Sequence, residues 1–201
     1  MSRDELDGDH KYDRSGIEFF EDQSVHEYWR SANADYHRSG YDRGHLAAAG
    51  NHRRDHKLVA QTFVLSNISP QVGKGFNRDA WNRLEKYCRW RARRSDGLWV
   101  CTGPLYLPAR DRSDGKLYVK YEVIGRNHVS VPTHFFKVLV WQTDGRHWDM
   151  EAYVMPNAPI DDDKAIESFR VPIDTVERAA GLLFFQRLPR HQFRSINGKS
   201  V

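Results

Sequence analysis

The feature that most constrains the fold is a long helical pattern between residues 77 and 94, NRDAWNRLEKYCRWRARR. Its apolar residues Trp81, Leu84 and Cys88 recur at helical spacing, and Asn77 stands where a side chain can cap the first turn. The apolar stripe of such a helix is buried only when another layer of structure covers it. The pattern therefore predicts a helix that packs against the strand-rich runs that follow it.

Those runs occupy residues 98–107, 116–125, 133–142 and 149–156. Asp-Gly pairs at 114–115 and 144–145 suit hairpin turns between strands. A later helix is expected over 173–185, ended by Gly181. Ahead of the long helix we expect a short strand at 17–20, helical character over 53–63, and a β-rich run over 62–68 that stops at Ser69-Pro70. This order indicates an α+β fold with a mixed, largely antiparallel sheet.

Composition bounds the protein class. With 201 residues, 39% of them hydrophobic and 12% aromatic, the chain can bury one core, so a single domain over 1–201 is expected. The net charge of +4 favours a polyanionic partner only mildly, because 27 acidic residues dilute it. Cys88 and Cys101 are too few for a disulfide framework or a four-thiolate zinc site, and both are expected to be buried. No apolar run approaches the ~20 residues of a membrane span, and the charged N-terminus has no signal-peptide core.

The stretch YDRGHLAAAGNHR, residues 41–53, sets ionisable side chains against an apolar tetrad at 46–49. Charged groups beside a buried segment are costly unless they are paired or used. His45 is thus either a hydrogen-bonded structural histidine or a residue with a chemical role.

In the long helix, Asn77, Trp81 and Glu85 fall on one stripe. A neutral amide oxygen with a carboxylate two turns away suits Mg²⁺, which keeps several of its waters. The alternatives are a plain helix cap for Asn77 and a solvent-facing acid for Glu85.

Other chemistries fit less well. His52 and His56 are four residues apart, but Arg53 stands where a zinc protease needs glutamate, so both histidines are expected on a solvated helix face. The glycine-rich 72–76 lacks the frame of a P-loop, and no nucleophile-elbow or dinucleotide-binding pattern is present. The basic run Arg89, Arg91, Arg93 and Arg94 either contacts phosphates or complements the helix dipole.

Together, Asp42-Arg43-Gly44-His45, LSNISPQ at 65–71 and FNRDAWNRLE at 76–85 resemble the DNA/RNA non-specific nucleases of the ββα-metal superfamily, and most closely their mitochondrial members. The resemblance continues through CTGPLYLP, YVKYEVIG, VPTHFFKVLV, YVMPNAP and VERAAGLLFF, and covers about Phe20 to Phe185. It implies the ββα-metal fold, with a metal-binding helix packed on the sheet.

The resemblance also implies roles for individual residues. His45 matches the general base, Asn77 the single protein ligand of a catalytic Mg²⁺, and Glu85 a carboxylate that holds metal-bound water. Arg43 and Asn67 match residues near the phosphate, and Asp42 and Gly44 complete the motif around the histidine. Mn²⁺ is expected to substitute for Mg²⁺.

The implied function is Mg²⁺-dependent endonucleolytic cleavage of DNA and RNA with little sequence preference, leaving 5′-phosphate and 3′-hydroxyl ends. The alternative is a catalytically weak nucleic-acid-binding module that retains the fold. The resemblance further implies a homodimer, a protein inhibitor as partner, and residence in the mitochondrial intermembrane space, with release to the nucleus and a role in apoptosis. A targeting segment and a first strand, which family members carry ahead of this start, are expected to be missing from these residues.

Overall fold

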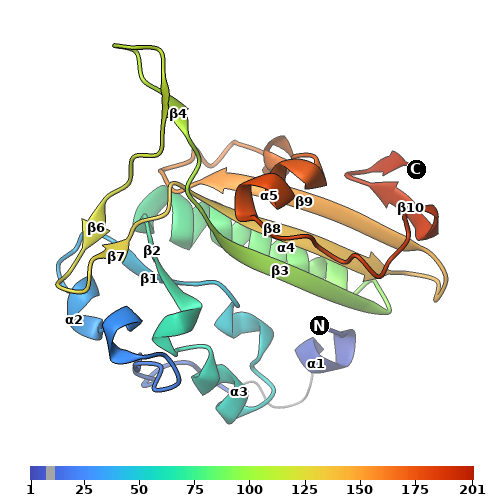
Figure 1. Ribbon diagram of the computed structural model, residues 1–201. Helices are drawn as coiled ribbons and strands as arrows, with labels where there is room; N and C mark the ends of the chain where they lie inside the picture. The colour runs from blue at the N-terminus through green and yellow to red at the C-terminus, as the bar shows by residue number, and fades with distance from the viewer. Residues whose placement is uncertain (8–11) are drawn as a thin grey trace.

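A five-stranded sheet lies between two helical layers in the computed structural model, which describes residues 1–7 and 12–201 (Figure 1). The strand order is β11-β10-β9-β8-β3, and every pair is antiparallel except β9 and β10. The mixed, largely antiparallel α+β architecture expected from the sequence is therefore present. The strands are β3 (Gly97–Leu105), β8 (His134–Gln142), β9 (Trp148–Pro156), β10 (Phe193–Ile196) and β11 (Lys199–Ser200).

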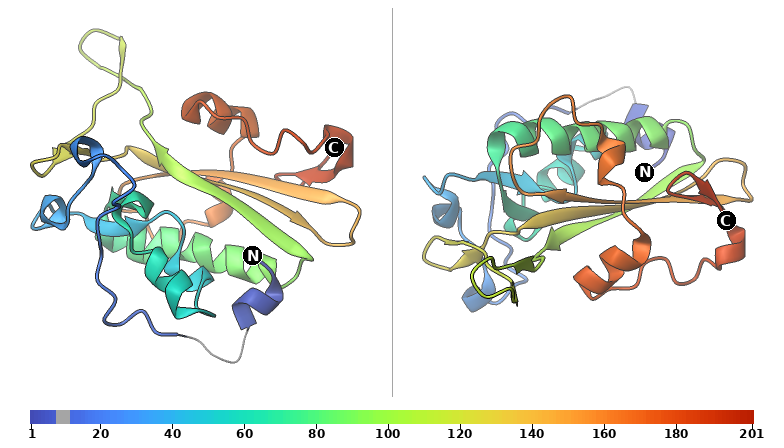
Figure 2. Two further views of the ribbon diagram at one scale, coloured as in Figure 1. Left: turned by 60° about the horizontal axis from the view of Figure 1, so that its bottom comes forward. Right: turned by 90° about the horizontal axis from the view of Figure 1, so that it is seen from above.

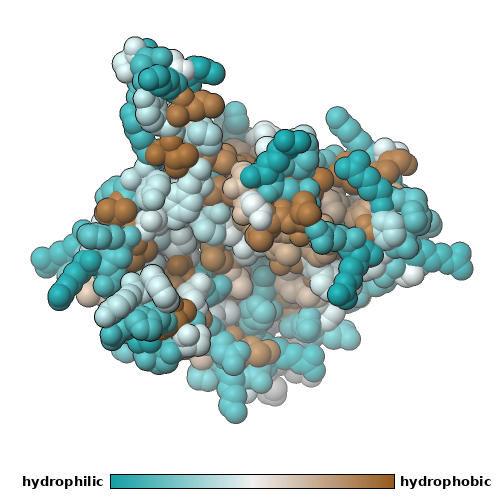
Figure 3. Space-filling model, viewed as in Figure 1, coloured by the Kyte–Doolittle hydropathy of each residue, from teal (hydrophilic) through white to brown (hydrophobic). Residues whose placement is uncertain are grey.

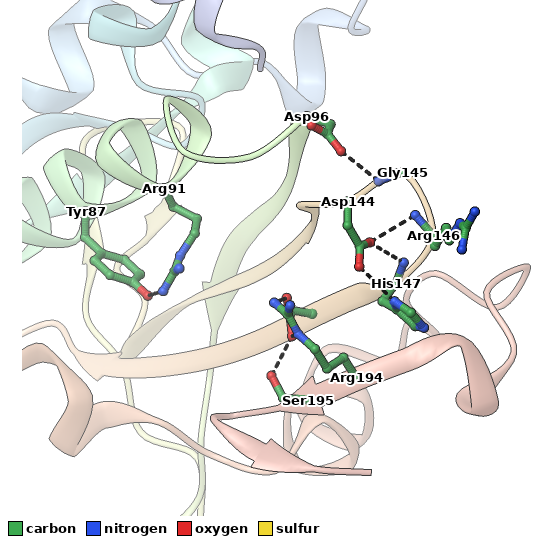
Figure 4. Close-up of polar contacts among 10 residues, drawn as sticks. Tyr87, Arg91, Asp96, Asp144, Gly145, Arg146, His147, Arg194 and Ser195 are labelled. Atoms are coloured by element: carbon green, nitrogen blue, oxygen red, sulfur yellow. Dashed lines mark hydrogen bonds and ion pairs between the residues drawn. The ribbon is translucent and has the colours of Figure 1, made fainter.

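Strands β3, β8 and β9 form the long centre of this sheet and agree with three of the predicted runs. The Asp-Gly pair at 144–145 closes the β8–β9 hairpin, as expected, and Gly145 has a positive φ of 67°. Asp144 accepts hydrogen bonds from the backbone N–H groups of Arg146 and His147, and the N–H of Gly145 donates to Asp96 (Figure 4). The turn is thereby tied to the segment that joins the long helix to β3.

The long helix is built from two consecutive segments, η4 (Gly73–Trp81) and α4 (Asn82–Ala92). Its backbone is irregular at Lys74 and Gly75, where φ is 85° at the glycine, and becomes regular from Phe76 onward. The expectation that Asn77 caps the helix is wrong. Its backbone N–H already donates to the carbonyl of Val72, so Asn77 lies inside the first turn with its side chain directed elsewhere.

Helix α4 covers one face of the sheet and α5 (Ile173–Ala180) lies on the other, as the edge-on view in Figure 2 shows. Trp81, Leu84 and Cys88 are at most 2% exposed, which confirms the predicted stripe. Helix α5 ends at Gly181, whose φ of 66° lets the chain turn back, also as predicted. The sheet side of the α4 core consists of Leu98, Phe135, Leu139, Trp141, Tyr153 and Met155.

A separate two-stranded ribbon, β1 (Asp42–His45) and β2 (Ile68–Gln71), lies beside the start of the long helix. The expected strand over 62–68 is wrong in position. Three residues of that run form the short helix η3 (Leu65–Asn67), Ile68 begins β2, and β2 passes through Ser69-Pro70. Each strand of a two-stranded ribbon has a free edge, where a proline's missing N–H is tolerated.

Residues 116–125 do not form the single strand that the sequence predicted. They split between two small hairpins, β4 (Ala109–Arg110) with β5 (Leu117–Tyr118) and β6 (Val123–Ile124) with β7 (Val129–Ser130). The first hairpin projects from the body, and apolar surface is visible on the projecting segment (Figures 1 and 3). Leu117 of β5 is 60% exposed. The run at 17–20 likewise makes only one bridge, from Phe20 to Val64.

The remaining helices are short and lie mostly around the ribbon and the ends of the chain. None of the helices in the described part of the chain is long and apolar enough to cross a bilayer. Cys88 and Cys101 are free thiols, the first buried and the second partly exposed. These helices are α1 (Arg3–Asp7), η1 (Glu27–Trp29), α2 (Asn33–Tyr36), η2 (Ala49–Asn51), α3 (His56–Gln61), η5 (Ile166–Phe169) and η6 (Arg190–Gln192).

Leu84→Ala should lower the free energy of unfolding by about 2–5 kcal/mol, because it opens a cavity between α4 and the sheet. Lys86→Ala on the exposed side of the same helix should change it by no more than about 0.5 kcal/mol. Urea unfolding followed by circular dichroism measures both. Equal effects at the two positions would contradict the packing described here.

Candidate active site

An open pocket of about 790 Å³ lies between the β1–β2 ribbon, the long helix and the segment around residues 13–19. It brings together four side chains singled out from the sequence. They come from β1 and from the first three turns of the helix, which meet only in the folded protein. These four are Arg43, His45, Asn77 and Glu85.

His45 is held in an apolar clamp at the pocket wall. The centroid of its ring lies 5.5 Å from that of Phe19 and 4.8 Å from that of Phe63, which it meets edge-on. Burial lowers the pKa of the imidazole to about 4, and the positive charge of Arg14 acts in the same direction. The Nε2 atom is buried and has no hydrogen-bond partner among residues 1–7 and 12–201. The imidazole is therefore neutral at neutral pH, which is the form in which a histidine can accept a proton.

Gly44 allows the ribbon to close beside this histidine. A Cβ built on Gly44 would stand 2.0 Å from Oε1 of Gln71, a side chain that is fully buried. Any larger residue would force Gln71 away and would disturb the β1–β2 pairing. The glycine of the motif is therefore explained by close packing and not by an unusual φ.

Asp42 links the strand to the helix. Its carboxylate accepts a hydrogen bond from Nδ2 of Asn77 at 3.0 Å and forms an ion pair with Arg78. The bond to Arg78 comes first among the causes that hold the pKa of Asp42 below its usual range, so the carboxylate is ionised at neutral pH. Because Nδ2 is committed to Asp42, the Oδ1 atom of Asn77 is the one that can face a cation in the pocket.

Glu85 places a largely desolvated carboxyl on the same side of the helix as Asn77. Burial raises its pKa, and the positive charges of Lys137, Arg89 and Arg14 oppose that rise. Trp81, the third member of the predicted stripe, does not line the pocket, because its side chain is fully buried under the helix. Asn77 and Glu85 of the predicted stripe therefore line the pocket, whereas Trp81 between them packs into the core.

Cations surround the site. Arg43 lies 5.0 Å over the ring of Phe19 and donates a 2.5 Å hydrogen bond to Asn33. Arg14 and Arg89 also line the pocket; the sequence left phosphate contact open for Arg89 and did not point to Arg14. The sequence indicates the position of Arg89, because a residue four places after Glu85 lies on the same side of the helix. No such indication exists for Arg14, because its approach to His45 depends on tertiary structure.

The other arginines of the predicted basic run are committed elsewhere. Arg91 donates to the hydroxyl of Tyr87 (Figure 4) and lies over the ring of Trp141, and Arg93 pairs with Asp7. Arg94 lies over the ring of Trp90. The pocket therefore draws only on Arg89 from this run.

Asn67 does not line the pocket. Its Oδ1 accepts from the N–H of Ala47, and its Nδ2 donates to the carbonyls of Ala47 and Thr62. The side chain pins the backbone that leaves His45, so its contribution in this structure is to shape the loop.

The pocket fits a hydrated oxygen-binding cation better than zinc. No cluster of three or more His, Cys, Asp or Glu side chains suited to a metal occurs in the described ranges 1–7 and 12–201. The amide oxygen of Asn77, oriented by Asp42, and the carboxyl of Glu85 are a small set of hard oxygen donors, which Mg²⁺ prefers.

The sequence predicted that His52 and His56 lie on a solvated helix face, and this holds only for His56. His52 lies outside α3 and is partly buried, which lowers its pKa.

Comparison with known proteins gives a consistent result. Residues 2–191 match the family described as DNA/RNA non-specific endonuclease. The chain is 57% identical over 171 residues to mitochondrial endonuclease G of Bos taurus, covering 85% of this chain and 56% of that protein. It is 52% identical over 186 residues to mitochondrial endonuclease G of Caenorhabditis elegans, covering 92% and 60%. The chain thus spans less than two thirds of the length of these relatives.

A solved structure is similar throughout. A chain in a crystal structure of the EndoG/EndoGI complex, concerned with the mechanism of EndoG inhibition, superposes with a TM-score of 0.96 at 53% identity. The match covers all of this chain and 82% of that one. The ββα-metal fold predicted from the sequence is confirmed by this likeness and by the family match.

The His45 imidazole should remain neutral down to about pH 4 in the folded protein, because Phe19 and Phe63 exclude water from it. An NMR titration of the assigned ring measures this pKa, and the urea-unfolded chain should return the ordinary value of ~6.5. Phe63→Ala should raise the folded-state pKa toward that value. A pKa near 6.5 in the folded wild type would contradict the apolar clamp.

Asp42→Asn should weaken Mn²⁺ binding about 10–100-fold, because the neutral side chain no longer fixes the Asn77 amide. Isothermal titration calorimetry on the metal-free protein measures the change. Asp162→Asn is the matched control, since Asp162 also pairs with an arginine of the same helix but lies outside the pocket. An equal loss in both variants would assign the effect to helix charge and not to Asn77.

Proposed function

The chain belongs to the DNA/RNA non-specific endonuclease family, and we propose that it hydrolyses phosphodiester bonds of DNA and RNA at the pocket of His45 and Asn77. The observation that carries the proposal is the neutral imidazole of His45, which lines a pocket that also contains several arginines and an oriented amide oxygen. These groups meet the needs of a reaction in which water attacks an anionic phosphate.

In the proposed mechanism, the imidazole of His45 accepts a proton from the water that attacks phosphorus and later releases it to solvent. The bond from phosphorus to the 3′ oxygen breaks, and the leaving oxygen takes a proton from solvent water, which gives 5′-phosphate and 3′-hydroxyl ends. Arg43, Arg14 and Arg89 supply positive potential at the phosphate. Their guanidinium groups bind the nucleic-acid backbone and read no base edge, so little sequence preference is expected.

We propose Mg²⁺ as the metal, with Asn77 as its protein ligand and Glu85 oriented toward its waters. Bound there, the ion would neutralise charge on the phosphate and on the leaving oxygen. The fit rests on the donor set, one amide oxygen that Asp42 fixes and one nearby carboxyl. Mn²⁺ accepts the same ligands and should substitute.

The proposal also covers where the protein resides in the cell and which proteins it binds. Relatives named as mitochondrial support residence in mitochondria, and we place the protein in the intermembrane space with release to the nucleus. The EndoG/EndoGI complex supports a protein inhibitor as a partner. We also propose that residues 1–201 act as one nuclease domain, since one central sheet carries an apolar core on each of its two faces. We further propose that two copies form a homodimer.

A plasmid-nicking assay tests the activity. The protein should cut supercoiled DNA and single-stranded RNA with Mg²⁺, and EDTA should stop both reactions. His45→Ala should lower kcat by about 10²–10⁴, the usual contribution of a general base, while DNA binding measured by fluorescence anisotropy persists. Asn77→Ala should abolish the Mg²⁺-dependent cleavage.

His56→Ala is the matched control, because His56 is exposed on α3 outside the pocket, and its activity should equal that of the wild type. A wild-type protein that binds DNA without cutting it under Mg²⁺ would instead support the alternative of a binding module. Full activity in His45→Ala would remove this histidine from the mechanism.

A further inference from the structure

An asparagine just beyond the central sheet binds the chain where it enters the long helix. Asn157 is the first residue after β9, and its backbone N–H donates to the carbonyl of Thr133 at 2.9 Å, so its own position is fixed by the sheet. It lies in YVMPNAP, one of the runs by which the sequence resembles the nuclease family. Asn157 does not line the pocket, so any effect that it has on the site is indirect.

The side-chain amide of Asn157 uses its acceptor and both of its donors. Oδ1 accepts a hydrogen bond from the backbone N–H of Val72 at 2.8 Å. Nδ2 donates to the carbonyl of Pro70 at 3.1 Å and to that of Pro132 at 2.9 Å. All three lengths are those of ordinary N–H···O hydrogen bonds. Only an amide offers an acceptor and two donors in a side chain of this size, because aspartate has no donor when ionised and leucine has no polar group.

Val72 links Asn157 to the proposed metal ligand. It is the single residue between β2 and η4, and its carbonyl accepts the backbone N–H of Asn77 at 2.9 Å. Asn157 and Asn77 thus bind the same residue, one at its N–H and the other at its carbonyl. A displacement of Val72 would therefore move the first turn of the helix, which carries the Asn77 side chain.

A second contact from the same loop holds this turn. The backbone at Gly75 is not helical, so regular helix hydrogen bonds do not fix it. The carbonyl of Gly75 accepts the backbone N–H of Ile160 at 3.2 Å, and a Cβ built on Gly75 would stand 2.8 Å from the Cα of Pro159. Residues 157–160 therefore touch the start of the long helix at two points, Val72 and Gly75.

We infer that Asn157 is a positioning residue for the metal site, whose amide fixes Val72 to the central sheet and thereby sets the position of the Asn77 backbone. Asp42 acts on the same ligand in a different way, because it binds the Asn77 side chain. The inference rests on the proposed function for its catalytic consequence, and on the hydrogen bonds of Asn157 for its structural basis. A displacement of ~1 Å is enough to spoil the geometry of a site of this kind.

Mn²⁺ binding to the metal-free protein tests the inference without catalysis. Asn157→Ala removes all three side-chain hydrogen bonds. It should weaken Mn²⁺ binding about tenfold in isothermal titration calorimetry, at the lower end of the range for groups that orient a metal ligand, because its effect passes through Val72. In the cleavage assay, the variant should need more Mg²⁺ to reach half of its maximal rate, and should recover the wild-type kcat at saturating Mg²⁺.

Amide hydrogen exchange in the metal-free protein shows whether the turn itself is loosened. In Asn157→Ala, the Asn77 amide should exchange at least about tenfold faster than in the wild type when both are compared with amides of β8, whose exchange requires global unfolding. The comparison with β8 removes any general loss of stability from the result.

Asn197→Ala is the matched control. The Asn197 amide also accepts from a backbone N–H, that of Ala152 at 3.0 Å, and donates to a carbonyl, that of Val171 at 2.8 Å, but it lies in the β10–β11 turn outside the pocket. This variant should have a lower urea midpoint, with the Mn²⁺ affinity and the relative exchange of the Asn77 amide unchanged. Equal weakening of Mn²⁺ binding in both variants would overturn the inference, and so would wild-type affinity and exchange in Asn157→Ala.

A second variant covers the case in which Asn157→Ala does not fold. Asn157→Ser keeps a polar group, but its single hydroxyl has one donor and cannot replace the three hydrogen bonds of the amide. It should weaken Mn²⁺ binding and speed exchange of the Asn77 amide in the same direction. Wild-type values of both in Asn157→Ser would overturn the inference.

The two proposals fail in different ways. If the wild type does not cleave nucleic acid with Mg²⁺, the proposed function fails, and the exchange of the Asn77 amide still decides whether Asn157 holds it. If the wild type cleaves, but Asn157→Ala matches Asn197→Ala in Mn²⁺ affinity and in exchange, the nuclease stands and the role of Asn157 is refuted.

Discussion

The hydrogen bonds that Asp42 accepts from Asn77 and Arg78 of the long helix are the interaction on which the site depends. Asp42 is the first residue of β1, and His45 is the last. By binding the Nδ2 of Asn77 and the guanidinium of Arg78, the carboxylate fixes the strand against the helix. Without this contact, the proposed base and the proposed metal ligand would lie on two elements free to shift relative to each other.

The helix can serve as one side of this contact because its other side is anchored in the core. Phe76, Trp81 and Leu84 are fully buried against the sheet, so a rotation of the helix would expose large apolar side chains. The polar side of the helix is thereby turned toward the ribbon. Packing of these apolar residues fixes the rotation of the helix, and with it the directions of the Asn77 and Glu85 side chains.

Desolvation gives the pocket its chemical character. The rings of Phe19 and Phe63 keep His45 neutral, and burial acts on the Glu85 carboxyl in the opposite direction, toward a raised pKa. Cations near the carboxyl oppose that shift, so the same low dielectric that favours a neutral histidine makes each nearby charge count for more. The pocket is therefore sensitive to charges that do not contact a substrate.

The sequence by itself determined the elements whose pattern is local. The stripe of Trp81, Leu84 and Cys88 predicted the helix, and Gly181 marked the end of α5, because spacing and turn chemistry act between near neighbours. The Asp-Gly turn at 144–145 was readable for the same reason. The motif residues Arg43, His45, Asn77 and Glu85 were also identified from the sequence, and the fold brings all four to one pocket.

Only the tertiary structure decided which segments found partners. Residues 116–125 have the composition of a strand but gain only short hairpin pairings, while β2 passes through Pro70 because a two-stranded ribbon leaves it an open edge. The fold brings Arg14 into the same pocket as His45, and it lets Asn67 bind the backbone of Ala47, although each pair is distant in sequence. Periodicity carries no information on such long-range pairing, because pairing depends on which surfaces remain uncovered once the helix and the sheet have packed.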